Sequence, residues 1–442
     1  MPNGRRGSGR PVDGSPILGD AALEKLQRDT LGYFLDLTNR ANGLVPDNTR
    51  PGAHASIAAV GFALASYPIG VARGFITRDD GIERTLATLR FFWNSEQSDA
   101  PNATGYKGFY YHFLQMDSGR RAWKCELSTI DSTILLAGAL TTAAYFDGDA
   151  PAEREIRELA AALYARADWQ WALNGGQTVS MGWKPKSGFL RYRWEGYNEA
   201  LILYVLAIAS PTHPIPLESY EAQARSYRWR KIYGYELLYA GPLFIHQLSH
   251  LWIDFRGIQD DFMRGKKIDY FENSRRATYV QQQYAIRNPR KCAGYGENCW
   301  GITASDGPGP ESVTISGSKR RFLGYKARAV PYGPDDGTIA PWAAVASLPF
   351  APEIVLPALQ HFRERFPEMI GQYGFTCSLN PTFPSAVPGQ AGWISKGYYG
   401  LDQGPVLMMI ENHRSAFLWD LMKGCPFIVQ GLRLAGFTGG WL

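Results

Sequence analysis

Apolar residues recur at helical spacing through most of this chain of 442 residues, and alternating, strand-like segments are few and short. The spacing predicts helices over 21–40, 54–77, 79–96, 128–147, 151–172, 196–210, 217–228, 242–264, 268–286, 338–349, 352–365, 398–415 and 426–436. Breaking residues support several of these limits, since Asp147-Gly148-Asp149 ends one helix and Pro151 begins the next. The chain is therefore predicted to be all-α.

The connections between these helices are alternately short and long, which is typical of helical hairpins that close into a ring. In such an α/α toroid the inner helices point one end at a central bowl. An open solenoid is the alternative, but the sequence contains no repeat of fixed period. We expect one domain over residues 21–442, preceded by a polar tail, residues 1–20, that is predicted to be disordered.

Composition excludes several classes of protein. The net charge is only +5 and the basic residues are scattered, whereas nucleic-acid binding requires a denser basic stripe. No apolar run reaches the length of about 18 residues that a membrane span needs. Five cysteines form no CxxC pair, and free buried thiols are expected for most, although Cys292 and Cys299 are near enough in sequence to close a small loop.

Four long loops hold much of the Gly, Pro, Tyr and Trp content. They span residues 98–127, 173–195, 287–337 and 370–400. Loops of this length in a compact domain usually build a functional site. Their aromatic residues suit flat, amphipathic ligands such as sugar rings, while for any single Trp the simpler role is to seal a loop onto the core.

Two carboxylates, Glu195 and Glu199, precede the apolar run in "RWEGYNEALILYVLAIASPTHP". If the helix begins near Glu195, these side chains share one face, flanked by Trp194 and Tyr197. Partial burial among aromatic rings raises the pKa of a carboxyl group, as a general acid requires at neutral pH. Helix capping is the alternative role, and it suits Glu195 better than Glu199.

A similar arrangement appears in "WKCELSTIDSTILLAGAL", where Glu126 and Asp131 precede or enter an apolar helix. Ser128 is expected to cap that helix, with Asp131 as the acid of the capping box, which leaves Glu126 without a structural role. Upstream, "YYHFL" contributes Tyr111 and His112, polar aromatic side chains that suit sugar hydroxyls.

The segment "GYYGLDQGPVLMMIENHRSAFLWDLM" places Asp402 in a Gly-bracketed turn before another apolar helix. Two roles stay open for Asp402. It is either a helix N-cap or, flanked by Tyr399 and Gln403, a residue that activates water or contacts a substrate.

His246, His250 and Asp254 recur every four residues in "GPLFIHQLSHLWIDFRG", a spacing that suits metal binding. The motif lacks the Glu of HExxH and a fourth ligand, so buried or substrate-contacting histidines are expected, and no metal. The loop "YGENCWGITASDGPG", with Glu297 and Trp300, is expected to fold over a ligand. Without a phosphate-binding loop, a nucleophile elbow or a protease-like signature, carboxylate acid chemistry without a cofactor is the remaining hypothesis.

Six segments in the same order resemble the glucoamylase-like family grouped as glycoside hydrolase family 144, the bacterial β-1,2-glucanases. They are "ELSTIDSTILLAG", "EGYNEALILYVLAIASPTHP", "GPLFIHQLSHLWIDFRG", "YGENCWGITASDG", "DDGTIAPWAAVASLPFAPE" and "GYYGLDQGPVLMMIENHRSAFLWDLM". The resemblance covers about residues 25–436. It implies an (α/α)6 barrel and hydrolysis of β-1,2-glucan with inversion at the anomeric carbon, and it does not support the α-1,4 specificity of a glucoamylase.

The resemblance also implies roles for particular residues. The acid of the "YNEA" segment is Glu199, the aspartate of "GLDQG" that helps to activate water is Asp402, and Glu126 and Asp131 match the other carboxylates of the pocket. The residues expected to contact substrate are Glu195, Tyr111, His112, Trp194, Tyr197, His246, Glu297, Trp300, Tyr399 and Gln403.

Other functions stay open on the same scaffold. A transglycosylase or an exo-acting oligosaccharide hydrolase would differ in whether loops 98–127 or 287–337 block one end of the cleft. A polysaccharide lyase would use Tyr111, His112 or His246, and a glycan-binding protein would lack turnover. An extracellular glucan requires export, yet this N-terminus carries no apolar signal segment. Either the start lies upstream or the enzyme acts on imported oligosaccharides in the cytoplasm. The sequence leaves the oligomeric state open.

Overall fold

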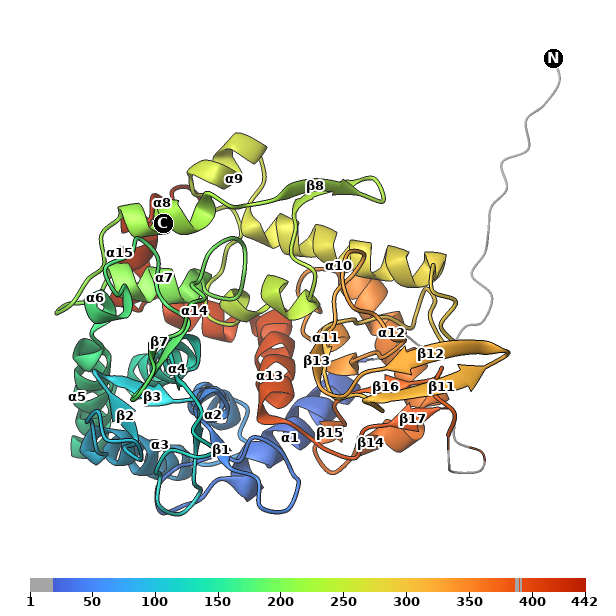
Figure 1. Ribbon diagram of the computed structural model, residues 1–442. Coiled ribbons are helices and arrows are strands. Elements are labelled where there is room, and N and C mark those ends of the chain that lie inside the picture. The colour runs from blue at the N-terminus through green and yellow to red at the C-terminus, as the bar shows by residue number, and fades with distance from the viewer. Residues whose placement is uncertain (1–18, 386–388, 390–391) are drawn as a thin grey trace.

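The computed structural model describes residues 19–385, 389 and 392–442, and most of them lie in helices or their connections (Figure 1). The helices are α1 (Asp20–Leu37), α2 (Ile57–Ala72), α3 (Arg78–Asn94), α4 (Thr129–Tyr145), α5 (Pro151–Arg166), α6 (Trp169–Ala172), α7 (Leu201–Ile208), α8 (Glu218–Ala224), α9 (Asp261–Lys266), α10 (Tyr270–Arg287), α11 (Pro341–Val345), α12 (Pro352–Arg365), α13 (Gly400–Ser415), α14 (Phe417–Lys423) and α15 (Pro426–Leu434), with short 3-10 helices η1 (Leu243–His246), η2 (Leu248–Leu251) and η3 (Pro367–Met369).

The strands are short and lie in the connections. They are β1 (Ala55–Ser56), β2 (Gly105–Tyr106), β3 (Phe109–Tyr111), β4 (Phe113–Leu114), β5 (Leu127–Ser128), β6 (Gly182–Lys184), β7 (Gly188–Phe189), β8 (Trp229–Ile232), β9 (Tyr235–Leu238), β10 (Ala304–Ser305), β11 (Glu311–Ile315), β12 (Ser318–Phe322), β13 (Lys326–Ala327), β14 (Ile370–Gly371), β15 (Gly374–Phe375), β16 (Leu379–Asn380) and β17 (Trp393–Ile394). Antiparallel pairing joins five of them in the order β2-β3-β5-β6-β7, and the others form two-stranded pairs.

The fold is an (α/α)6 barrel, as predicted, with helices in an inner and an outer ring. Nearly every residue is buried in α2, α4, α7, α11 and α13, which with η1 and η2 form the inner ring. The outer helices α1, α3, α5, α10, α12 and α15 bury one face each and leave the other to solvent. Figure 1 shows α13 near the middle, with α5 and α12 on opposite sides of it.

Two glycines allow the inner helices α2 and α4 to pack backbone against backbone. A Cβ atom on Gly138 would lie 2.1 Å from the carbonyl oxygen of Gly61, and one on Gly61 would lie 2.4 Å from the carbonyl oxygen of Ile134. Only glycine permits this approach, which brings the N-terminal ends of both helices to the same side of the barrel.

Several of the predicted helices differ from the structure, and the predicted helix 338–349 is α-helical only over α11. The segment 242–264 contains η1, η2 and, after the left-handed Gly257 (φ 75°), the beginning of the short helix α9. The segment 151–172 divides into α5 and α6, because Asp168 caps a new helix by accepting a hydrogen bond from the backbone N–H of Trp171 (2.9 Å). The α14 helix and the five-stranded sheet were not predicted, because elements this short leave little periodicity in a sequence.

The predicted helix 196–210 begins late, at Leu201, for a local reason. The Asn198 side chain accepts a hydrogen bond from the N–H of Ala200 (2.9 Å) and donates one to the carbonyl of Glu195 (3.2 Å). Such side-chain bonds compete with the helix for backbone groups, and Gly196 is left-handed (φ 78°). The prediction that Glu195 and Glu199 share a helix face is therefore wrong.

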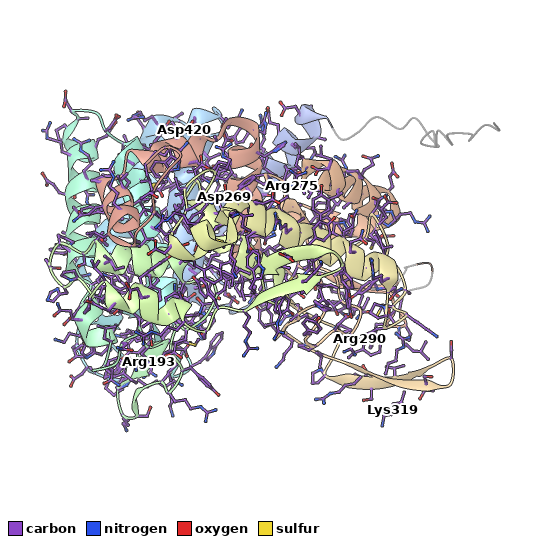
Figure 2. All side chains as sticks on the ribbon, turned by 90° about the horizontal axis from the view of Figure 1, so that it is seen from above. Arg193, Asp269, Arg275, Arg290, Lys319 and Asp420 are labelled. Atoms are coloured by element: carbon purple, nitrogen blue, oxygen red, sulfur yellow. The ribbon has the colours of Figure 1, made fainter. Side chains whose placement is uncertain are left out.

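Several other features follow from the described residues. All five cysteines are buried free thiols. Within the described ranges, no helix is long and apolar enough to cross a bilayer. The predicted disordered tail, residues 1–20, lies outside the described residues except for Gly19 and Asp20, and Asp20 begins α1. The hairpin β11–β12, which carries Lys319, projects from the body of helices (Figure 2).

Candidate active site

A cavity of about 360 Å³ lies where the inner ring converges. Each inner element contributes to its lining: Phe62 from α2, Asp131 from α4, Glu199 just ahead of α7, Gln247 between η1 and η2, Trp342 from α11 and Asp402 from α13. The five-stranded sheet and its flanks add His112 and Glu126. This convergence explains why acidic residues precede apolar helices in the sequence, since the helix ends aim them into one bowl.

Glu199 lies in the turn before α7, where the Ser249 hydroxyl donates a hydrogen bond to its backbone carbonyl (3.1 Å). Burial raises the pKa of the Glu199 carboxyl to about 7, the backbone N–H of the same residue opposes this shift, and the Asp131 carboxylate adds to it. The Glu199 carboxyl is therefore protonated in a large fraction of the molecules near neutral pH, and the protonated form is the one that a general acid needs.

Asp402 lies in the first turn of α13 and is only 5% exposed. The N-cap of α13 is Tyr399, so Asp402 is not the N-cap. Burial raises the pKa of the Asp402 carboxyl well above its usual value; a hydrogen bond from Cys377 opposes the shift, and the Asp47 and Asp306 carboxylates add to it. A carboxylate in such surroundings is a strong proton acceptor once it is ionised.

Three polar atoms in the lining have no hydrogen-bond partner among the described residues. They are Oδ2 of Asp402, Oε1 of Gln247 and Nε1 of Trp342. Most buried polar atoms in proteins are paired. The wall of the cavity therefore holds three buried polar groups whose hydrogen bonds the described residues do not satisfy.

His112 lies between two carboxylates on the sheet side of the cavity. Its Nδ1 is 2.9 Å from Oε1 of Glu126 and its Nε2 is 3.7 Å from Oδ2 of Asp131. Burial alone would lower the pKa of His112, but Asp131, Glu126 and Asp47 together raise it to about 9. The hydrogen bond from His112 in turn lowers the pKa of Glu126 to about 2, against the effect of burial. This wall of the cavity therefore holds a cation between two carboxylates.

Asp131 has the capping role that the sequence predicts and also faces the cavity. Its N–H bonds to the Ser128 hydroxyl oxygen (3.3 Å), and that hydroxyl donates to the Asp131 carboxylate. Trp194 also lines the cavity, with its indole N–H donating to the Thr129 hydroxyl (2.9 Å). The prediction that Glu126, Asp131, Glu199, Asp402, His112 and Trp194 gather at one site matches this geometry.

Other predicted substrate contacts lie outside the cavity. Three of them are in β3 or in the segment just before α7. Glu195 is exposed and accepts a hydrogen bond from Thr178 (2.9 Å). Tyr111 is fully buried under the guanidinium of Arg121, because strand alternation turns it away from His112. Tyr197 is buried among the rings of Tyr227, His246 and Tyr270.

The remaining predicted contacts are also placed elsewhere. His246 is a buried core residue that bonds to the carbonyl of Ala240 (3.2 Å), and burial lowers its pKa to about 4. Trp300 is fully buried, and Gln403 donates to the carbonyl of Phe375 (3.3 Å). Glu297 is exposed. Tyr399 is buried behind the lining residue Tyr325, with ring centres 6.4 Å apart.

The sequence pattern missed several residues around the cavity. Gln247, Trp342 and Tyr325 line it, and Asp47 acts on both His112 and Asp402. The sequence contains a signal for Trp342, because this residue lies in the first two turns of the predicted helix 338–349, as the candidate acids do in theirs. Tyr325 and Asp47 are isolated loop residues whose position depends on tertiary structure alone. Among the described residues, no His, Cys, Asp and Glu side chains group as metal ligands.

Comparison with known proteins identifies relatives over nearly the whole chain. Residues 191–426 match a family model named Glycoamylase and described as "Putative glucoamylase". A curated relative from Parabacteroides distasonis, an exo β-1,2-glucooligosaccharide sophorohydrolase (non-reducing end), is 29% identical over 454 residues, covering 95% of this chain. The chain spans 58% of the length of that relative.

Solved structures give the same result. A "putative glucoamylase" from Bacteroides uniformis is 32% identical, with a TM-score of 0.84, and the match covers 97% of this chain and all of that one. An endo-β-1,2-glucanase from Chitinophaga pinensis, in complex with sophorotriose and glucose, is 27% identical, with a TM-score of 0.83; the match covers 96% of this chain and 99% of that one.

Proposed function

The chain belongs to the glycoamylase family, and from this premise we propose that it is a glycoside hydrolase that cleaves β-1,2-glucan or its oligosaccharides. The observation that carries the proposal is the convergence of Glu199 and Asp402, two carboxyls with raised pKa values, on one cavity. Relatives from Parabacteroides distasonis and Chitinophaga pinensis, named for action on β-1,2-linked glucose, support the choice of linkage.

In the proposed reaction Glu199 is the general acid. It gives its proton to the glycosidic oxygen while the bond from that oxygen to the anomeric carbon breaks. Asp402 accepts a proton from the water whose oxygen bonds to the anomeric carbon from the opposite face, so the configuration inverts. This direct geometry needs the two carboxyl groups roughly 6.5–9.5 Å apart, whereas a retaining enzyme needs about 5–5.5 Å.

The other polar residues of the cavity bind and orient sugar hydroxyls in this proposal. Glu126 and Asp131 accept hydrogen bonds from hydroxyl groups, and the His112 cation beside Glu126 lowers the pKa of that carboxyl and favours its ionised state. Trp194 and Trp342 supply apolar surface for the faces of the rings. Endo action on the polymer is our leading form of the proposal, and exo action is the alternative that the Parabacteroides relative suggests.

The test is incubation of wild type and Glu199→Gln with linear β-1,2-glucan, with chromatography of the products and NMR of the newly formed anomeric centre. We expect short β-1,2-oligosaccharides of inverted configuration, and a loss of about 10²-fold or more in Glu199→Gln. Glu195→Gln is the matched control, because this exposed glutamate lies outside the cavity, and it should keep wild-type activity.

Four outcomes would contradict parts of the proposal. Polymer left intact by wild type would overturn endo action, and oligosaccharides left intact as well would overturn β-1,2-glucan hydrolysis. Retained configuration would remove Asp402 from the role of base. Equal activity of Glu199→Gln and Glu195→Gln would remove Glu199 from the role of acid.

A further inference from the structure

A second cavity, of about 890 Å³, lies beside the first and plays no part in the proposed chemistry. Its lining comes from the loop at Arg50, from Asp306, and from the two sides of the β16–β17 hairpin, which carry Phe383 and Trp393. Tyr398 is a third aromatic residue in this lining. This cavity is larger than the candidate active site.

The two cavities share a wall, because the same chain segments contribute to both. Ala304 lines the first cavity and Asp306 the second, while Leu401 and Asp402 line the first and Tyr398 the second. Thr376 lines the second cavity, and its neighbour Cys377 acts on the carboxyl of Asp402, whose pKa it lowers. A ligand in the second cavity therefore lies on the Asp402 side of the active site.

The lining combines aromatic and polar groups in the way that sugar sites do. Trp393 is half-buried and offers apolar surface. The Arg50 guanidinium lies 2.6 Å from Oδ2 of Asp306, with Arg50 61% exposed and Asp306 11% exposed at their side chains. The Ser395 hydroxyl donates to the same oxygen (3.3 Å). Such planar, partly accessible charged groups can exchange hydrogen bonds with pairs of sugar hydroxyls.

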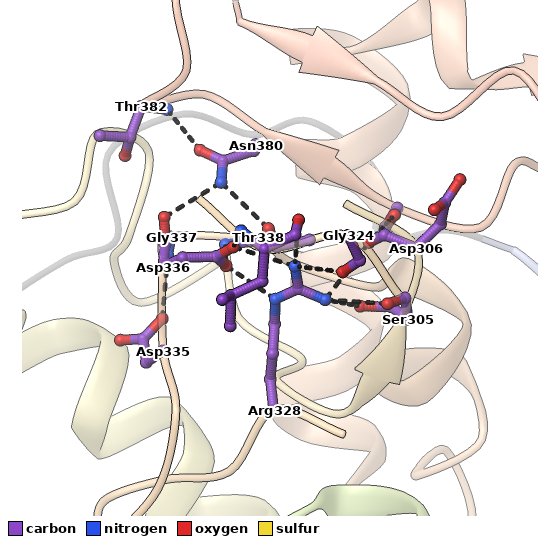
Figure 3. Close-up of polar contacts among 12 residues, drawn as sticks. Ser305, Asp306, Gly324, Arg328, Asp335, Asp336, Gly337, Thr338, Asn380 and Thr382 are labelled. Atoms are coloured by element: carbon purple, nitrogen blue, oxygen red, sulfur yellow. Dashed lines mark hydrogen bonds and ion pairs between the residues drawn. The ribbon is translucent and has the colours of Figure 1, made fainter. Parts of the chain in front are cut away.

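The floor of this cavity is held in place by a buried ion pair, drawn in Figure 3. The fully buried Arg328 bonds to Asp336 (2.7 and 2.9 Å) and donates to the backbone carbonyls of Ser305 (2.8 Å) and Asp306 (3.4 Å). The Ser378 hydroxyl donates to the same carbonyl of Asp306 (2.9 Å). The Asp306 backbone is thus fixed before any ligand arrives, as a preorganised binding site requires.

We propose that this second cavity binds glucosyl units of the substrate chain that lie several units from the cleaved bond. The inference rests on the proposed function and adds a preference for long substrates. A long chain can fill the distal site and gain binding energy there, whereas a short oligosaccharide cannot reach it. Binding by units outside the reacting bond lowers KM without changing the chemical step.

The test compares Trp393→Ala with wild type on long β-1,2-glucan and on the shortest oligosaccharide that wild type cleaves. We expect KM for the long chain to rise about tenfold, with kcat unchanged and both constants for the short substrate unchanged. Trp93→Ala, which removes an exposed tryptophan from the outer helix α3, is the matched control and should leave all constants unchanged. Trp393→Phe keeps an aromatic ring on the same wall of the cavity, and should give a smaller rise in KM for the long chain alone if Trp393→Ala folds poorly.

The outcomes separate this inference from the proposed function. If Trp393→Ala and Trp393→Phe shift KM equally for long and short substrates, or for neither, the second cavity is not a distal site. If wild type cleaves no β-1,2-linked substrate, the proposed function fails. Calorimetric titration of long β-1,2-glucan into Glu199→Gln, with and without Trp393→Ala, then tests the cavity separately. Loss of binding in the double variant supports the site, and unchanged binding overturns it.

Discussion

At the scale of the residue, burial of the candidate acid raises its pKa and lowers the stability of the fold at neutral pH. Burial of Glu199 raises its pKa from the ordinary 4.5 to about 7. Below pH 4.5 the carboxyl is protonated in the folded and in the unfolded chain alike. Between pH 4.5 and about 7 only the folded chain holds the proton, so the free energy of unfolding falls as pH rises, and above about 7 this loss is complete. The same burial that suits general acid catalysis therefore destabilises the fold at neutral pH.

Glu199→Gln removes this ionisation and should make the protein more stable than wild type at pH 8. The expected gain in free energy of unfolding is at most about 3 kcal/mol, because part of the side chain reaches the cavity, and it should vanish near pH 4. Urea unfolding at pH 4, 6 and 8 measures it. Glu195→Gln, at the exposed glutamate, should show no pH-dependent gain. A difference between Glu199→Gln and wild type that is the same at all three pH values would contradict a raised pKa.

At the scale of the element, the contact between α2 and α4 sets the position of the cavity. Gly138 and Gly61 face each other there across backbone atoms, which cannot move aside as a flexible side chain can. The end of α4 carries Asp131 and α2 carries Phe62, so the separation of these helices fixes one wall of the site.

Gly138→Ala should lower the free energy of unfolding by about 3 kcal/mol, because its Cβ would lie 2.1 Å from the carbonyl oxygen of Gly61. Gly265→Ala, in the helix α9, is the matched control: nothing lies within 4 Å of its Cβ position, and a gain of about 0.5–1 kcal/mol is expected from the better helix former. Urea denaturation midpoints measure both changes. Equal effects of the two substitutions would show that α2 and α4 have room to separate.

Only part of these elements and of the site could be predicted from the sequence. Helical periodicity predicts the long buried helices α2, α4 and α13, and carboxylates at their beginnings point to Asp131 and Asp402. It fails where a single side chain redirects the backbone, as Asn198 does when it delays α7. It also fails for Tyr197, since aromatic residues that stack in the core leave the same pattern as aromatic residues that face a ligand.

At the scale of the whole molecule, the barrel closes where the last inner helix, α13, meets α1 and α2. Glu411 of α13 is 3% exposed at its side chain and bonds through both oxygens to Arg73, which follows α2 (2.8 Å each). Gln27 of α1 donates to the same carboxylate (2.7 Å). Burial would raise the pKa of Glu411, but Arg73, Ser415 and Gln27 together lower it, so the carboxylate stays ionised inside the closure.

Arg73→Ala should therefore lower the free energy of unfolding by about 3 kcal/mol, because it leaves a buried carboxylate without its cation. Adding Glu411→Gln should recover part of this loss, since the charge that lacks a partner is then gone. Arg275→Ala, which breaks the exposed ion pair with Glu353, is the control and should cost less than about 1 kcal/mol. Urea unfolding of the four proteins measures these differences. If the double variant is no more stable than Arg73→Ala, the loss comes from the packing of the Arg73 side chain and not from a buried carboxylate left without its cation.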